Sequence, residues 1–168
     1  MKEVVYNNPI VSVIEKKNES DYEKKIITLE SPNWVNIIPI TKNNEVVFVR
    51  QFRHGISSET LEIPGGMIDN HEAPDVAAKR ELFEETGYAC DKITELGNIS
   101  PNPALFSNRV FTFLGKGVFL KESSIDNQGE INEVVLINLK DVPKLVKTSV
   151  IDHALVIVAF HLFDLYNN

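Results

Sequence analysis

The sequence predicts an α+β fold, in which short strands dominate the first half of the chain and strands and helices are mixed in the second half. Three observations predict it: runs rich in β-branched residues separated by turn-forming residues before residue 60, a helical pattern over 73–86, and the apolar run "ALVIVAF" at 154–160. The 168 residues suit one domain, large enough to bury a core without disulfides or a structural metal.

The expected strands of the first half are runs of Val, Ile and Thr bounded by polar residues. They cover residues 10–14, 24–30, 35–40 and 45–52. The segment "TKNNE" at 41–45 separates the last two with turn-forming residues, so we expect these two strands to form a hairpin. Together the four runs predict an N-terminal sheet.

The segment 73–86 is predicted to be a helix because Pro74 is tolerated in a first helical turn and Gly87 stands where helices commonly end. The polar segment 121–132 is expected to be a mobile loop. The remaining elements are strands at 93–99, 109–118 and 133–139, a short helix after Asp141 and an apolar helix from about Asp152.

Charge and composition exclude several kinds of partner. Seventeen basic and 24 acidic residues give a net charge of -7, which disfavours a broad surface for nucleic acid. The apolar run at 154–160 is far shorter than the roughly 20 residues of a membrane span. The single cysteine, Cys90, cannot form an internal disulfide, and the N-terminal residues lack the regions of a signal peptide. We therefore expect a cytoplasmic protein that binds neither nucleic acid nor membranes.

Three glutamates, Glu81, Glu84 and Glu85, are crowded into five positions of the predicted helix. They would share one face, with neighbouring Cβ atoms roughly 5–6 Å apart, and each like-charge pair costs a few tenths of a kcal/mol that Arg80 offsets only in part. Magnesium or manganese would compensate, because hard cations prefer carboxylate oxygens and Mg²⁺ completes its coordination shell with substrate phosphates. The alternative is a solvated acidic surface.

The spacing around these glutamates resembles the signature of the Nudix hydrolase family. Five residues separate Gly66 from Glu72, and seven more lead to "RELFEETGY". The signature positions there are Arg80, Glu81, Leu82, Glu84, Glu85 and Gly87. Tyr88 is the single departure, since an aliphatic residue is usual at that place. We call residues 66–88 the signature segment, and the resemblance continues from about residue 35 to the end of the chain.

The resemblance implies a fold and a reaction. The fold would be the Nudix α/β/α arrangement, a mixed sheet between helices, with residues 36–168 as the hydrolase domain and residues 1–35 as an N-terminal extension of antiparallel strands. In the similar ADP-ribose enzymes such an extension helps to build a homodimer, so we expect a homodimer here. The reaction would be the metal-dependent hydrolysis of a nucleoside diphosphate linked to another group.

Residue by residue, the resemblance also assigns metal ligands. Glu81 and Glu85 would bind the metal directly, Glu84 would bind it directly or through water, and the carbonyl group of Gly65 would be a further ligand. Arg80 would orient the glutamates.

Outside the metal ligands, Glu72 is expected to tether the loop to the helix. The base that accepts a proton from the attacking water would come from a loop beyond the signature, with Glu130 as first choice and Glu133 as second. Both could instead be ordinary surface glutamates.

Substrate preference is indicated by "QFR" at 51–53 and "ETLEIPGG" at 59–66, which resemble the approach to the signature in ADP-ribose pyrophosphatases. Arg53 would contact a phosphate or the terminal ribose, or would form a salt bridge with Glu62, itself a candidate substrate-binding residue. Pro103 lies sixteen positions after Gly87, close to a spacing associated with ADP-ribose specificity.

Other residues bear on this prediction less directly. Asn108 stands where an acidic residue often occurs in the similar enzymes. Trp34 is expected to pack in the core, and the alternative is that it stacks on a base, within one chain or across a dimer interface. Cys90 is expected to be a small buried residue. The four histidines show no ligand spacing and are expected to be structural or exposed: His54, His71, His153 and His161.

The sequence thus predicts a magnesium-dependent pyrophosphatase acting on ADP-ribose or a related nucleoside diphosphate such as GDP-mannose. The alternatives are a Nudix-fold module that binds a nucleotide without cleaving it, and an unrelated α+β scaffold. Loss of a signature carboxylate would favour the first alternative, but all of them are present.

Overall fold

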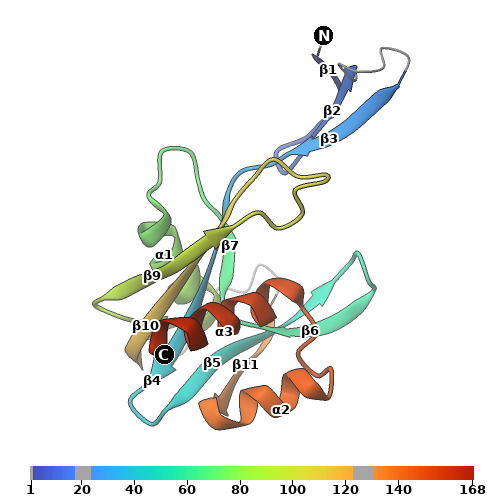
Figure 1. Cartoon of the computed structure of the whole chain (residues 1–168). Coiled ribbons are helices and arrows are strands. Elements are labelled where there is room, and N and C mark those ends of the chain that lie inside the picture. The colour runs from blue at the N-terminus through green and yellow to red at the C-terminus, as the bar shows by residue number, and fades with distance from the viewer. Residues whose placement is uncertain (1, 18–23, 123–130) are drawn as a thin grey trace.

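The computed structural model describes residues 2–17, 24–122 and 131–168 (Figure 1). The N-terminal part of the chain forms a small antiparallel sheet of its own, in the order β1–β2–β3. Its strands are Lys2–Asn7, Ser12–Lys17 and Lys25–Glu30. In Figure 1 this blue sheet projects away from the rest of the molecule, and every residue of β1 is exposed, although Ile14 on β2 is buried.

The second sheet has eight strands and is mixed. Its central order is β11–β5–β4–β10–β8, with β6 paired to β5, β7 to β4 and β9 to β10. β4 and β10 run parallel, and the other pairs are antiparallel. The strands are β4 (Trp34–Thr41), β5 (Glu45–Arg53), β6 (Ser58–Glu62), β7 (Gly65–Met67), β8 (Tyr88–Ala89), β9 (Ile93–Ile99), β10 (Val110–Leu120) and β11 (Ile131–Asn138).

Helices cover both faces of this sheet. The alternation of side chains along β4 decides which helix covers which face. Val35 and Ile37 pack in a core cluster with α1 (Pro74–Thr86), whereas Ile38 and Ile40 pack in a second cluster with α3 (Ala154–Asn167). The short helix α2 (Val142–Lys147), which follows a 3₁₀ turn at Leu139–Asp141, lies with α3. The expected mixed sheet between helices is confirmed.

The ends of α1 follow from its residues. Pro74 occupies the first turn, where a missing N–H is harmless. Gly87 ends the helix in the left-handed conformation, with φ 70°, and donates its N–H to the Phe83 carbonyl at 2.8 Å. A side chain at Gly87 would also collide with the Glu122 carbonyl oxygen. The predicted helix is therefore confirmed to within one residue.

Most other predicted elements are confirmed, including the β4–β5 hairpin, in which Ile40 opposes Val46. Six elements differ. β1, β6, β7 and β8 were not predicted as strands, β2 begins two residues later than expected, and β11 begins at Ile131 inside the predicted loop. Residues 123–130 of that loop lie outside the described residues. None of the described helices is long and apolar enough to cross a membrane.

Candidate active site

Arg80 connects several residues of the signature segment by hydrogen bonds. Its Nε and Nη2 donate to the two oxygens of Glu72, both at 2.9 Å. Its Nη1 donates to Glu81 at 2.8 Å and to Glu84 at 2.9 Å, and Nη2 also reaches the Met67 carbonyl at 3.1 Å. These carboxylates raise the pKa of Arg80, with the hydrogen bonds to Glu72 as the largest cause. The guanidinium thus fixes two of the three crowded glutamates.

Glu72 makes the tethering contacts predicted for it. Besides its bonds to Arg80, its Oε2 accepts from the Asp69 backbone N–H at 3.1 Å. The interaction with Arg80 holds the pKa of Glu72 below its usual value. The loop before α1 is therefore joined to the middle of the helix by one side chain.

Glu85 is partly buried and faces the backbone of β7. Its Oε2 accepts from the Gly65 N–H at 3.1 Å. Burial, followed by the charge of Glu81, raises the pKa of Glu85 to about 8, and burial also raises the pKa of Glu81. Two neighbouring carboxylates therefore resist ionisation together in the metal-free protein.

The backbone approaches these carboxylates closely. A Cβ atom at Gly66 would lie 2.5 Å from Glu81 Oε1, so the carboxylate occupies the space that any other residue would fill. Buried carboxylate oxygens beside exposed backbone groups are the donor set that a hard divalent cation prefers. The residues therefore fit a divalent metal ion.

The side chains of Glu81, Glu84 and Glu85 do not form a preformed metal site. Among the described residues, no three His, Cys, Asp or Glu side chains are grouped to hold a metal ion. Glu84 is the outlying member, with 56% of its side chain exposed, whereas 13% of the Glu81 side chain is exposed. Arg80 binds one oxygen of each, so metal binding would require these side chains to rearrange.

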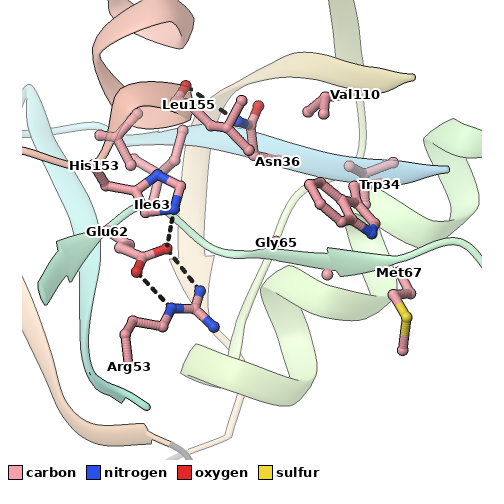
Figure 2. Close-up of a pocket in the computed structure, with 13 residues that line it drawn as sticks. Trp34, Asn36, Arg53, Glu62, Ile63, Gly65, Met67, Val110, His153 and Leu155 are labelled. Atoms are coloured by element: carbon pink, nitrogen blue, oxygen red, sulfur yellow. Dashed lines mark hydrogen bonds and ion pairs between the residues drawn. The ribbon is translucent and has the colours of Figure 1, made fainter. Parts of the chain in front are cut away.

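A pocket of about 390 Å³ lies beside β7 and the start of α3 (Figure 2). Gly65 and Gly66 line it, so it adjoins the backbone that contacts Glu85 and Glu81. The other lining residues come from β4, the β5–β6 hairpin, β10 and α3 with the residue before it. They are Trp34, Val35, Asn36, Arg53, Glu62, Ile63, Met67, Val110, His153, Leu155 and Val156.

A charged network forms one end of this pocket. Arg53 donates from Nε and Nη2 to the two oxygens of Glu62, both at 2.7 Å, and Thr60 Oγ1 lies 2.6 Å from Glu62 Oε1. His153 Nε2 lies 3.7 Å from Glu62 Oε2. Burial raises the pKa of Glu62, but the hydrogen bonds from Arg53 and Thr60 hold it below its usual value. The salt bridge considered for Arg53 is thus present, within the pocket.

Trp34 forms part of the opposite end. It is partly buried, and its ring meets Phe106 edge-on, with centroids 5.7 Å apart. It belongs to neither core cluster. The expectation that it packs in the core was therefore wrong, because Trp34 lines the pocket and is only partly buried.

Other predicted residues lie away from the pocket. Pro103 is exposed and is not a lining residue. Asn108 is buried and donates to the Pro32 carbonyl at 3.0 Å. Glu133 is exposed on β11 and pairs with Arg50 at 3.2 Å. Glu130 lies outside the described residues.

Sequence reasoning missed two polar residues of the pocket, Asn36 and His153. Asn36 interrupts the apolar run of β4, and a polar residue at a buried strand position was a signal that could have identified it. His153 was treated as structural or exposed, but it lines the pocket at the N-terminus of α3, and no local pattern marks it. Cys90, expected to be buried, is half-buried beside Gly115.

Comparison with known proteins decides the family. The family model described as NUDIX domain matches residues 32–159. The chain belongs to the Nudix family. This confirms the predicted Nudix hydrolase, and enzymes of this family generally require a divalent metal, which the Glu81–Glu85 region fits.

The Nudix chain is similar to several characterised proteins. It is 28% identical over 152 residues to ADP-ribose pyrophosphatase of Bacillus subtilis (strain 168), which covers 88% of this chain and 81% of the relative. It is also 28% identical over 156 residues to the methanol dehydrogenase activator of Bacillus methanolicus, covering 92% and 83%. A solved structure of an ADP compounds hydrolase superposes with a TM-score of 0.81 at 21% identity, covering 99% of this chain and 91% of that chain. This last match confirms the fold.

Proposed function

We propose that this Nudix hydrolase cleaves ADP-ribose, or a related nucleoside diphosphate sugar, into a nucleoside monophosphate and a sugar phosphate. One observation carries the proposal: the pocket and the signature glutamates share a wall, since Gly65 and Gly66 line the pocket and contact Glu85 and Glu81. A nucleotide in the pocket would thus place its diphosphate beside these carboxylates. The name of the Bacillus subtilis relative supports the choice of ADP-ribose.

Glu81 and Glu85 would hold Mg²⁺, or Mn²⁺ in its place, with Glu84 and the Gly65 carbonyl as further ligands. When bound, the metal would neutralise charge on the diphosphate and lower the pKa of the attacking water. Arg80 would position Glu81 and Glu84, because it already binds both.

Arg53, which lines the pocket, would bind a phosphate or the terminal ribose. Its pairing with Glu62 supports this role, because a guanidinium held at two points keeps a fixed orientation. Pro103 is proposed to contribute to ADP-ribose preference only through its loop, since it is exposed and does not line the pocket.

The general base would be Glu130, with Glu133 as the second candidate. Glu133 is the weaker choice on its surroundings, since it is exposed and paired with Arg50. Replacing each by Gln and measuring kcat separates them, because loss of a general base lowers the rate by about 10²–10⁴-fold. Equal wild-type rates for both variants would place the base elsewhere.

We also propose that the enzyme is a homodimer in the cytoplasm. The N-terminal sheet supports a dimer, because three of its apolar side chains, Val4, Val5 and Tyr6, are more than half exposed. The lone cysteine suits a reducing compartment. Sedimentation equilibrium that finds a monomer at micromolar concentration would contradict the dimer.

The decisive experiment incubates purified protein with ADP-ribose and magnesium and separates AMP from ribose 5-phosphate by chromatography. GDP-mannose and other nucleoside diphosphates form the comparison panel, and hydrolysis in ¹⁸O-labelled water identifies the phosphorus attacked. Calorimetric binding of these compounds without any product would instead establish a nucleotide-binding module.

A further inference from the structure

The imidazole of His153 lines the pocket but lacks a hydrogen-bond partner among the described residues. Its backbone is held in place, because the His153 carbonyl accepts from the N–H groups of Val156 and Ile157 at 3.0 and 3.1 Å in the first turn of α3. Nδ1 is buried and unpartnered, and Nε2 lies 3.7 Å from Glu62 Oε2, which is too long for a hydrogen bond. Since Nδ1 is buried, Nε2 is the ring nitrogen that a ligand can reach.

Glu62 has an unused acceptor position beside this ring. Its Oε1 accepts from Arg53 Nε and from Thr60 Oγ1. Its Oε2 accepts from Arg53 Nη2 at 2.7 Å and, within the part of the chain that the structure describes, from no other donor. A carboxylate oxygen can accept two hydrogen bonds. Figure 2 shows His153 and Arg53 approaching Glu62 from opposite sides, so the unused position of Oε2 lies on the His153 side.

One hydroxyl group would satisfy both side chains. An ionised carboxylate only accepts, so the nitrogen that faces it carries the proton of the neutral imidazole. Across a gap of 3.7 Å, one oxygen atom can lie within about 2.8 Å of both atoms, accepting from His153 Nε2 and donating to Glu62 Oε2. An ionised phosphate oxygen only accepts, and it would add negative charge beside Glu62, whose side chain is 5% exposed. The gap therefore suits a hydroxyl group.

The gap also lies where a sugar of the substrate would be expected. Gly65 and Gly66, beside which the diphosphate would bind, line the same pocket, and a nucleoside diphosphate sugar carries a sugar on each side of its diphosphate. We propose that His153 is a specificity-determining residue, whose Nε2 donates to one sugar hydroxyl of the substrate while that hydroxyl donates to Glu62. The inference rests on the proposed function in one respect, since the substrate must carry a sugar beside its diphosphate.

Binding of the two expected products tests the proposal without turnover and identifies the sugar. AMP carries the nucleoside ribose, and ribose 5-phosphate carries the terminal ribose. Calorimetry in the presence of magnesium compares each product with its single-deoxy forms. For one of the two products, removal of one hydroxyl should weaken binding to the wild type about tenfold or more, because His153 and Glu62 lose the group that joins them.

Variants of His153 show whether this effect depends on its ring nitrogen. His153→Phe keeps a flat ring but removes the donor, so it should bind that product about tenfold more weakly, with no further loss for the deoxy form. His153→Gln supplies an amide donor near the position of Nε2 and should stay within a few-fold of the wild type. The matched control is His161→Phe, which replaces an exposed histidine of α3 and should leave the affinities unchanged.

Deoxy losses of equal size in the wild type and in folded His153→Phe would overturn the proposal, as would wild-type affinity of His153→Phe for both products. Circular dichroism melts show whether each variant is folded. If His153→Phe is not, the wild type still decides, because absence of any deoxy effect, or of binding by both products, overturns the proposal.

The enzyme assay separates this proposal from the proposed function. Hydrolysis of ADP-ribose in the absence of any His153-dependent deoxy effect would contradict the role of His153 alone. Conversely, a His153-dependent deoxy effect without hydrolysis of any diphosphate would support the hydroxyl site and contradict the proposed function.

Discussion

Two glutamates near the same pocket, the buried Glu62 and the partly buried Glu85, have opposite electrostatic surroundings. Glu62 receives two hydrogen bonds from Arg53 and one from Thr60, which hold its pKa below the usual value. Glu85 receives one backbone hydrogen bond and faces Glu81, and its pKa rises to about 8. The fold compensates the charge of Glu62 but not that of Glu85, in keeping with the proposed role of Glu85 as a metal ligand. Burial alone therefore does not distinguish a structural carboxylate from a functional one, whereas its partners do.

The largest expected effect on catalytic activity comes from replacing Glu85, whose charge the fold does not compensate. Glu85→Gln should lower kcat/KM for ADP-ribose by about 10²–10³-fold, the scale of losing one group that stabilises charge in a transition state. Its melting temperature without metal should equal or exceed that of the wild type, because a costly buried charge is gone. Steady-state kinetics and thermal melts measure both. A near-wild-type rate would refute the metal-binding role of Glu85.

The pH dependence of stability should also follow Glu85 in the metal-free protein. Its pKa is raised to about 8 in the folded state and lies near the usual 4.5 of a glutamate in the unfolded chain. Between these values the folded protein holds a proton that the unfolded chain has released, so stability falls as pH rises from about 4.5 to 8. At about 1.4 kcal/mol per pKa unit, the loss amounts to several kcal/mol at most.

Urea denaturation in EDTA, repeated across this pH range, measures that loss. The Glu85→Gln variant is the matched control and should show a flatter profile. An identical profile in the variant and the wild type would mean that another group causes the pH dependence.

Magnesium should offset the loss of stability that ionisation of Glu85 causes in the metal-free protein. At a free concentration of 100 times its Kd, it should stabilise the folded protein by about 2.7 kcal/mol. Thermal melts at pH 8 with and without magnesium should show this gain in the wild type and lose most of it in Glu85→Gln. If calorimetry detects no uptake of magnesium or manganese, even with AMP present, the metal site is misassigned.

Replacing Glu62, whose charge Arg53 compensates, should change stability in a different way from replacing Glu85. Glu62→Gln keeps the shape of the side chain but removes the charge that Arg53 pairs with, and should destabilise the protein by about 1–3 kcal/mol. The loss should be the same with and without magnesium, since Glu62 is not a proposed ligand. Urea denaturation in both conditions measures it, and a loss confined to the magnesium-bound protein would link Glu62 to the metal instead.

Much of the fold could be predicted because its signals are local. Pro74 and Gly87 define the ends of α1 through backbone geometry, and β-branched runs identify β4, β5 and β9. The missed strands lack such signals. β7 contains two glycines and one methionine, so it is a strand only because β4 provides its hydrogen-bond partners. The parallel pairing of β4 and β10 likewise depends on residues far apart in sequence.

The same distinction between local signals and long-range contacts applies to the candidate site. The signature glutamates could be predicted because they are neighbours on one helix, and the Arg53–Glu62 pair because both residues lie on one hairpin. Asn36 and His153 could not be joined to them, since 116 positions of sequence separate these two and only the packing of α3 on β4 brings them to one pocket. Pairwise spacing carries no information about such a contact.

The late position of α3 has a consequence for synthesis. At roughly 5–20 residues per second, several seconds pass on the ribosome between completion of α1 and arrival of the residues that close the pocket. During that interval β4 also lacks β10, its parallel neighbour. A nascent chain therefore contains its acidic helix segment for several seconds before all the residues of the pocket have been synthesised.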